Sequence, residues 1–188
     1  MNKYQEKNRY FIGLSIPEPI SSLISRYQTQ FIDKDIYMRP IIPHITLVPP
    51  NVLNELSLSE SLQRLKDINS KLKSFSATLN TINHFNNRVL HIALSDKVGV
   101  LRTTHESLID NLDIQSTVDG HIKQEFTPHI TLIQTKPYKQ FADQSLKRLI
   151  RNTQNYFDLP LKVNFQQIHM FLNKAPRTYE IVHTFQLL

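Results

Sequence analysis

The pentapeptide Pro-His-Ile-Thr-Leu occurs twice in this chain, and the repeat constrains the fold more than any other feature. The two copies are Pro43–Leu47 and Pro128–Leu132, and their histidines are 85 positions apart. Each copy predicts a β-strand, in which successive side chains point to opposite faces. Histidine and threonine then share one face, and isoleucine and leucine share the other. The polar faces carry four side chains: His44, Thr46, His129 and Thr131.

The pattern around the two copies also repeats, which indicates an internal duplication of roughly ninety residues. Further strands are expected at 10–16, 75–84, 89–95, 161–172 and 178–188, with an Asn-Asn turn between the second and third. Helical spacing of apolar residues predicts helices over 17–31, 57–75, 98–112 and 137–157. We therefore expect one α+β domain over residues 1–188, with a bilobal duplicated fold. Each lobe would hold a mainly antiparallel sheet with helices on its outer face, and a central cleft would separate the two sheets.

Composition excludes several classes of site. The chain has no cysteine, so disulfides, thiolate metal sites and a cysteine nucleophile are excluded. With 3 glycines it has no glycine-rich phosphate loop. Residues 1–9 are polar, and no apolar run reaches the ~20 residues that a membrane span needs. The formal charge of +6 favours anionic partners such as nucleotides or RNA. We expect a cytoplasmic monomer that does not bind membranes.

Two histidines and two threonines around one anion suit phosphoryl chemistry. An imidazole titrates near pH ~6.5, so one histidine can act as a base while the other is protonated. The threonine hydroxyls can donate hydrogen bonds to phosphoryl oxygens as charge develops there. This scheme needs neither a metal nor a cofactor. A di-histidine metal site is the main alternative, but no H-E-x-x-H or similar cluster accompanies the pair.

The other histidines carry less information. His105 lies on an apolar helical stripe and is expected to be packed. His91 alternates with apolar residues on its strand and can face either the substrate or the solvent. The remaining four have no partner at an informative spacing: His84, His121, His169 and His183.

The paired motifs resemble those of the 2H phosphoesterase superfamily, in particular its 2′-5′ RNA ligase-like and cyclic phosphodiesterase branch. The resemblance rests on "RPIIPHITLVPP" and "FTPHITLIQT", and it extends to "RYFIGLSIP", "VLHIALSD" and "IHMFLNKAPRTYEIVHTFQL". It implies a metal-independent enzyme that opens 2′,3′-cyclic phosphates or cleaves 2′-5′ phosphodiesters. His44 and His129 would be catalytic, and Thr46 and Thr131 would bind the phosphate. We assign His129 as the base toward water and His44 as the acid, although the order depends on the direction of attack and on which ribose oxygen leaves. A non-catalytic module that binds RNA or nucleotides is the alternative.

Further substrate contacts are expected from basic and aromatic residues near the motifs. The motif leaves open which nucleotide is bound and whether hydrolysis or ligation occurs, because all of these reactions displace an oxygen at phosphorus. The candidate contacts are Arg39, Phe11, Tyr37, Phe126, His91 and Tyr179.

Overall fold

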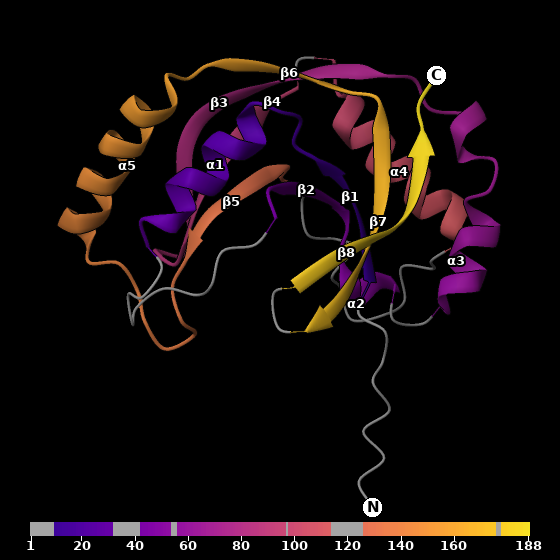
Figure 1. Ribbon diagram of the computed structural model, residues 1–188, viewed down its shortest axis with the longest axis horizontal. Helices are drawn as coiled ribbons and strands as arrows, with labels where there is room; N and C mark the ends of the chain where they lie inside the picture. The colour runs from indigo at the N-terminus through magenta and orange to yellow at the C-terminus, as the bar shows by residue number, and fades with distance from the viewer. Residues whose placement is uncertain (1–9, 32–41, 54–55, 97, 114–125, 176–177) are drawn as a thin grey trace, which may run out of the picture.

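The computed structural model describes residues 10–31, 42–53, 56–96, 98–113, 126–175 and 178–188. Its strands are β1 (Tyr10–Ser15), β2 (His44–Val48), β3 (Phe75–Phe85), β4 (Val89–Ser95), β5 (His129–Gln134), β6 (Leu161–Phe165), β7 (Gln167–Ala175) and β8 (Thr178–Gln186). Its helices are α1 (Ile20–Thr29), α2 (Pro50–Leu53), α3 (Leu58–Arg64), the short 3₁₀ helix η1 (Ile68–Ser70), α4 (Val100–Leu112) and α5 (Asp143–Phe157). Figure 1 shows the strands forming a curled sheet with helices packed on it.

The described strands form a single eight-stranded sheet, in the order β6-β3-β4-β5-β2-β1-β7-β8. Every neighbouring pair is antiparallel. The α+β class is as expected, but the expectation of two sheets is wrong. The reason is that the two repeated strands, β2 and β5, pair with each other at Ile45 and Ile130. This pairing joins two four-stranded halves into one sheet.

The two halves exchange their closing strands. The strands that follow the first pentapeptide, β3 and β4, lie beside β5, which carries the second pentapeptide. The strands that follow the second pentapeptide, β7 and β8, lie with β1 and β2. Each half of the sheet is therefore built from both halves of the sequence. The order of the repeat along the chain does not predict this exchange of strands.

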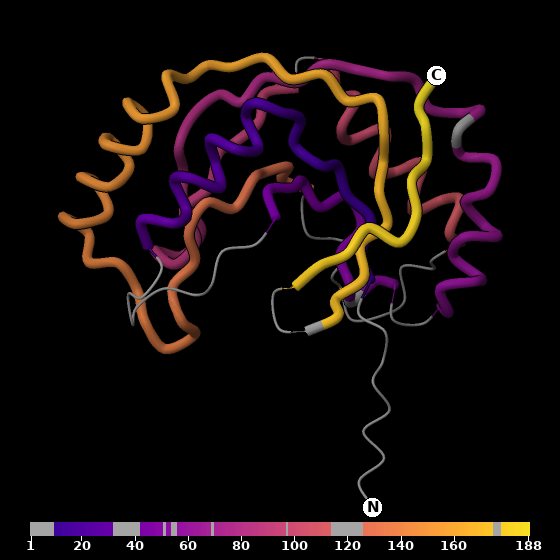
Figure 2. Tube along the Cα trace, viewed as in Figure 1, coloured from indigo at the N-terminus to yellow at the C-terminus, as the bar shows by residue number. Residues whose placement is uncertain are grey.

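The run 161–172, expected as one strand, is divided between the two halves. The chain passes from β6, an edge strand beside β3, through Gln166 into β7, which pairs with β1. Figure 2 shows this segment crossing the top of the molecule and then turning downward. Because Gln166 alone separates β6 from β7, the pattern of apolar residues does not show where the strand is divided.

The helices pack against the apolar face of the repeated strands. Helix α1, which precedes the first pentapeptide in the chain, contacts β5, and helix α4, which precedes the second, contacts β2. Each helix therefore covers the strand that carries the other pentapeptide. The four apolar residues of the two pentapeptides are buried in one continuous core: Ile45, Leu47, Ile130 and Leu132. Burial of this face leaves the histidines and threonines on the opposite face, which we call the His–Thr face.

Local signals explain several element boundaries. Asn86 and Asn87 have φ values of 49° and 52°, so the Asn-Asn turn between β3 and β4 adopts the left-handed conformation that asparagine tolerates. Helix α3 is capped by Ser57, because Ser57 and Glu60 form a reciprocal capping box. Helix α5 begins at Asp143, later than the expected Pro137.

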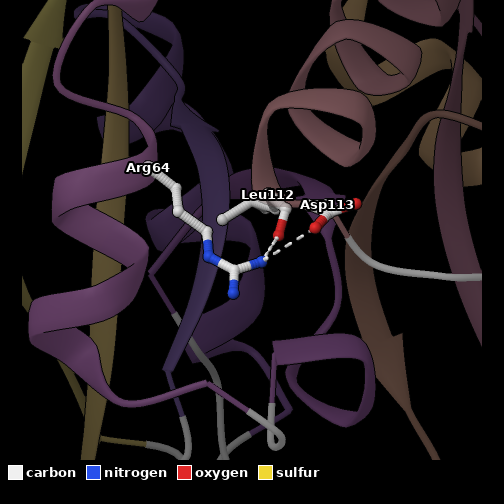
Figure 3. A network of polar contacts seen from close by, with 3 residues as sticks. All are labelled: Arg64, Leu112 and Asp113. Atoms are coloured by element: carbon white, nitrogen blue, oxygen red, sulfur yellow. Dashed lines mark hydrogen bonds and ion pairs between the residues drawn. The ribbon is translucent and has the colours of Figure 1, made fainter.

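One polar contact ties α3 to the end of α4. The Arg64 guanidinium donates a hydrogen bond to the Leu112 carbonyl, and its Nη1 lies 4.0 Å from a carboxylate oxygen of Asp113 (Figure 3). The last carbonyls of a helix have no partner within the helix, and a cation there is favourable. None of the described helices is both long and apolar enough to cross a membrane.

Candidate active site

The pairing of β2 with β5 brings the two pentapeptides together. Ile45 lies opposite Ile130, so continuing the register by one residue in each direction places His44 opposite Thr131 and Thr46 opposite His129. The two histidines are then diagonal neighbours, whose Cβ atoms in a regular ladder are roughly 7–8 Å apart. All four side chains are half-buried. The repeat thus places two imidazoles and two hydroxyls around one position on the His–Thr face.

A backbone carbonyl two residues earlier orients each imidazole. Nδ1 of His44 lies 2.7 Å from the Ile42 oxygen, and Nδ1 of His129 lies 2.9 Å from the Thr127 oxygen. A carbonyl only accepts hydrogen bonds, so Nδ1 carries the proton in both rings. Proton exchange with a substrate would therefore occur at Nε2 in both histidines.

Aromatic rings surround His44. Its ring centroid lies 4.8 Å from that of Phe11, 5.7 Å from that of Phe171 and 6.1 Å from that of Tyr179. Phe11 and Phe171 stack 4.7 Å apart and are 2% and 0% exposed, yet neither belongs to the main core cluster. Because Phe11 is covered, its ring supports His44 and does not offer an open surface for a nucleobase. Tyr179, the other expected contact here, is half-buried.

His129 is packed against two other rings. The ring of Phe85 lies edge-on to it at 4.9 Å, and the ring of His91 lies 5.2 Å away. Phe85 and His91 stack on each other at 4.1 Å. The expected contact His91 is therefore placed beside His129 and points away from solvent, since it is 2% exposed.

Burial affects the protonation of both histidines in this half of the sheet. It lowers the pKa of His129 below its usual value, although the hydrogen bond to Thr127 acts in the opposite direction. It lowers the pKa of His91 to about 4, and the neighbouring His129 adds to this shift. His129 is therefore neutral at neutral pH, with a lone pair on Nε2, as a general base requires.

The remaining sequence candidates lie elsewhere. Phe126 stacks on His105 at 4.4 Å, and Nδ1 of His105 donates to the Leu47 carbonyl 2.7 Å away, so both residues pack on the helical side of β2. Arg39 and Tyr37 lie outside the described residues. Within the described part of the chain, no three or more histidine, aspartate or glutamate side chains are grouped to hold a metal ion.

The structure adds features that residue patterns do not reveal. The carbonyls of Ile42 and Thr127 are backbone groups, so no side chain marks their role. Phe171 is far from His44 in sequence and reaches it only through the pairing of β7 with β1. Ser15 lies opposite His44 on β1, and its buried hydroxyl has no hydrogen-bond partner.

Solved structures share this fold. Escherichia coli LigT in complex with 3′-AMP is 16% identical and superposes with a TM-score of 0.64, over 97% of this chain and 99% of LigT. TT0787 of Thermus thermophilus is 19% identical with a TM-score of 0.65, over 95% of this chain and 97% of TT0787. A structure described as a phosphoesterase is 16% identical with a TM-score of 0.64, over 96% of this chain and 98% of that one.

No curated protein sequence matches this chain. The family model of the 2′-5′ RNA ligase superfamily matches residues 16–175, which include both pentapeptides. This match, with the shared fold, confirms the resemblance to the 2H phosphoesterases. The chain belongs to the 2′-5′ RNA ligase superfamily.

Proposed function

We propose that this protein is a metal-independent phosphodiesterase that acts on 2′,3′-cyclic phosphates or 2′-5′-linked nucleotides. The observation that carries the proposal is the pairing of β2 with β5, which places His44, Thr46, His129 and Thr131 on one face. Membership of the superfamily supports phosphodiester chemistry. The LigT structures hold 3′-AMP, phosphate, ATP or NADP+, which supports a small nucleotide ligand for this chain as well.

The geometry supports an in-line displacement at phosphorus. His129, neutral because its pKa is lowered, takes a proton from water through Nε2 as the water oxygen bonds to phosphorus. The bond from phosphorus to one ribose oxygen breaks, and that oxygen receives the Nε2 proton of His44, which enters the step as the imidazolium, protonated on both nitrogens, and leaves it neutral. A 2′,3′-cyclic phosphate then becomes a phosphomonoester beside a free hydroxyl. If a ribose hydroxyl replaces water as the nucleophile, the same steps join two nucleotides.

The threonines act on the charge that develops during this step. Thr46 and Thr131 lie opposite the two histidines, so their hydroxyls can donate to the non-bridging oxygens on either side of the phosphorus. Removing one such donor typically lowers the rate by roughly 10²–10³-fold. No metal is needed, because both proton transfers and the charge stabilisation come from side chains.

An end-product assay on EDTA-treated protein tests the proposal. The substrates are a short RNA ending in a 2′,3′-cyclic phosphate and a 2′-5′-linked oligoadenylate. We expect turnover of at least one, and a loss of roughly 10²–10⁴-fold in His129→Ala and in His44→Ala. His183→Ala is the matched control, because this exposed histidine packs against Phe185 and should not affect the rate.

Two results would contradict the proposal. The first is a wild-type rate in both single variants of the pair. The second is an absence of turnover with tight, salt-dependent binding of the same RNA, which would indicate a non-catalytic binding module.

A further inference from the structure

The two pentapeptides are identical, but their neighbours across the sheet are not. Opposite Thr46 on the adjacent strand β1 is Gly13, which has no side chain. Opposite Thr131 on β4 is His91. The imidazole of His91 is therefore on the strand adjacent to Thr131, whereas on the other side the corresponding imidazole, His169 on β7, lies one strand further away, opposite Gly13.

His91 forms a closed group of rings with Phe85 and His129. The three centroid separations are 4.1, 4.9 and 5.2 Å, so each ring contacts the other two. Phe85 and His91 are stacked with an angle of 19°, whereas His129 meets Phe85 edge-on at 83°. The rotation of the His129 ring is limited on this side by Phe85 and His91, and at Nδ1 by the Thr127 carbonyl.

The surroundings of His91 keep it neutral. The titratable groups that face it are His129 on β5 and His84 on β3, and both oppose its protonation. Its partner across β3 is Asn83, which is uncharged, and no carboxylate in the described part of the chain favours the imidazolium. Nδ1 of His91 is buried and makes no hydrogen bond of normal geometry, and the Val89 backbone, which acts to raise its pKa, is outweighed by burial. A neutral ring here excludes water from one side of His129 without adding a charge.

We propose that His91 is a positioning residue that holds the His129 ring in its orientation and, by excluding water beside it, makes His129 the proton acceptor of the pair. His44 has different surroundings, since the described rings packed against it are those of Phe11, Phe171 and Tyr179. The sequence repeat would thus supply two equivalent imidazoles, and the contact with His91 would make His129 the base of the pair. This inference rests on the proposed function, but it concerns a protonation state that can be measured without turnover.

The test compares His91→Ala and His91→Gln with His91→Phe. Alanine admits water beside His129, and glutamine brings an amide oxygen that stabilises an imidazolium, so both raise the pKa of His129. Phenylalanine keeps a ring and a dry contact, so the pKa stays near that of the wild type. An NMR titration of histidine-labelled protein measures this pKa directly, with the His129 signal identified by its loss in His129→Asn.

The pH dependence of kcat/KM gives a second measurement. A base must be unprotonated, so the acid limb moves to higher pH in the Ala and Gln variants, and their loss of activity is several-fold larger at pH 5.5 than at pH 8. Phe11→Leu is the matched control, because it disturbs the packing of His44 and leaves His91 in place. Its His129 titration should match that of the wild type.

An unchanged His129 pKa in both His91→Ala and His91→Gln would overturn the inference, and so would equal shifts in these variants and in His91→Phe. If the alanine variant does not fold, the glutamine variant, which is closer in volume, decides the question. If the wild type turns over none of the substrates but the His91 variants still show the predicted shifts in the His129 pKa, the proposed function is contradicted and the positioning role of His91 is not.

Discussion

At the scale of single residues, the candidate site consists of four side chains supplied by a five-residue repeat. Strand alternation was enough to predict that His44 shares a face with Thr46 and that His129 shares a face with Thr131, because the alternation depends only on β geometry. That the two pairs lie on one face of one sheet depends on the pairing of β2 with β5. The distinct surroundings of the two histidines could not be predicted. They come from Phe171, Phe85 and His91, which lie on strands whose positions in the sheet the sequence pattern does not specify.

The threonines provide the first prediction. Replacing Thr46 or Thr131 by valine keeps the shape of the side chain but removes the hydroxyl donor, so kcat should fall by roughly 10²-fold. Serine at the same position retains the donor and should keep most of the activity. Equal losses in the valine and serine variants would show that the methyl group, and not the hydroxyl, is what matters.

Gly13 connects the residue scale to the pairing of β1 with β2. A Cβ at this position would lie 2.5 Å from the backbone oxygen of Ile45, which cannot move without shifting the strand that carries His44. Gly13→Ala should therefore lower the free energy of unfolding by roughly 1–3 kcal/mol, as overpacking in a core does. Urea unfolding measures the change, and kcat should fall with it because β2 is displaced.

Ser15→Ala is the control for Gly13→Ala, since Ser15 lies on the same strand and its buried hydroxyl has no hydrogen-bond partner. Removing an unsatisfied polar group should leave the free energy of unfolding unchanged or raise it. A stable Gly13→Ala variant with normal strand pairing would contradict the close approach of β1 to β2.

At the scale of elements, Arg64 ties α3 to the end of α4. Arg64→Met keeps much of the side chain but loses the hydrogen bond to the Leu112 carbonyl, and it should destabilise the protein by about 1 kcal/mol. Asp113→Ala should change the free energy of unfolding little, because the Asp113 side chain is 81% exposed and exposed ion pairs contribute little. A larger effect of the Asp113 variant in urea unfolding would show that the ion pair, and not the capping of α4, joins the helices.

Most elements could be predicted from the sequence, since β1, β3, β4 and α4 begin and end close to their expected limits. These elements have strong local signals: alternation or helical spacing, and an Asn-Asn turn. The division of 161–172 into β6 and β7 was missed, because both parts are apolar and a single residue separates them. The single sheet was also missed, since the contact of Ile45 with Ile130 joins residues far apart in the chain.

For the whole molecule, burial of neutral histidines makes stability depend on pH. The pKa values of His91, His129 and His169 are all lowered by burial in the folded state, so the unfolded chain binds more protons in acid. This stability is fully present above pH ~6.5 and is lost as pH falls through the folded-state values. For His91, whose pKa falls from 6.5 to about 4, the loss is on the order of 3 kcal/mol.

Urea unfolding at pH 7.5 and pH 4.5 measures this dependence. The free energy of unfolding should be lower at pH 4.5, and the difference should be smaller in His91→Phe, which has no group to protonate at that position. Carboxylates also titrate near pH 4.5 and contribute to the pH dependence of both proteins. The contribution of His91 is therefore the difference between the wild type and His91→Phe. An equal pH difference in both would contradict the burial of a neutral His91.

We expect the repeated histidines to act together, one as a base and the other as an acid. The most direct test is the pH dependence of kcat/KM on a 2′,3′-cyclic phosphate substrate, measured with EDTA for the wild type, His44→Ala and His129→Ala. We predict a bell for the wild type, loss of the acid limb in the residual activity of His129→Ala, and loss of the alkaline limb in that of His44→Ala. Two results would contradict a base and an acid acting together: a wild-type kcat/KM that does not change with pH, or a single variant whose bell-shaped profile matches that of the wild type.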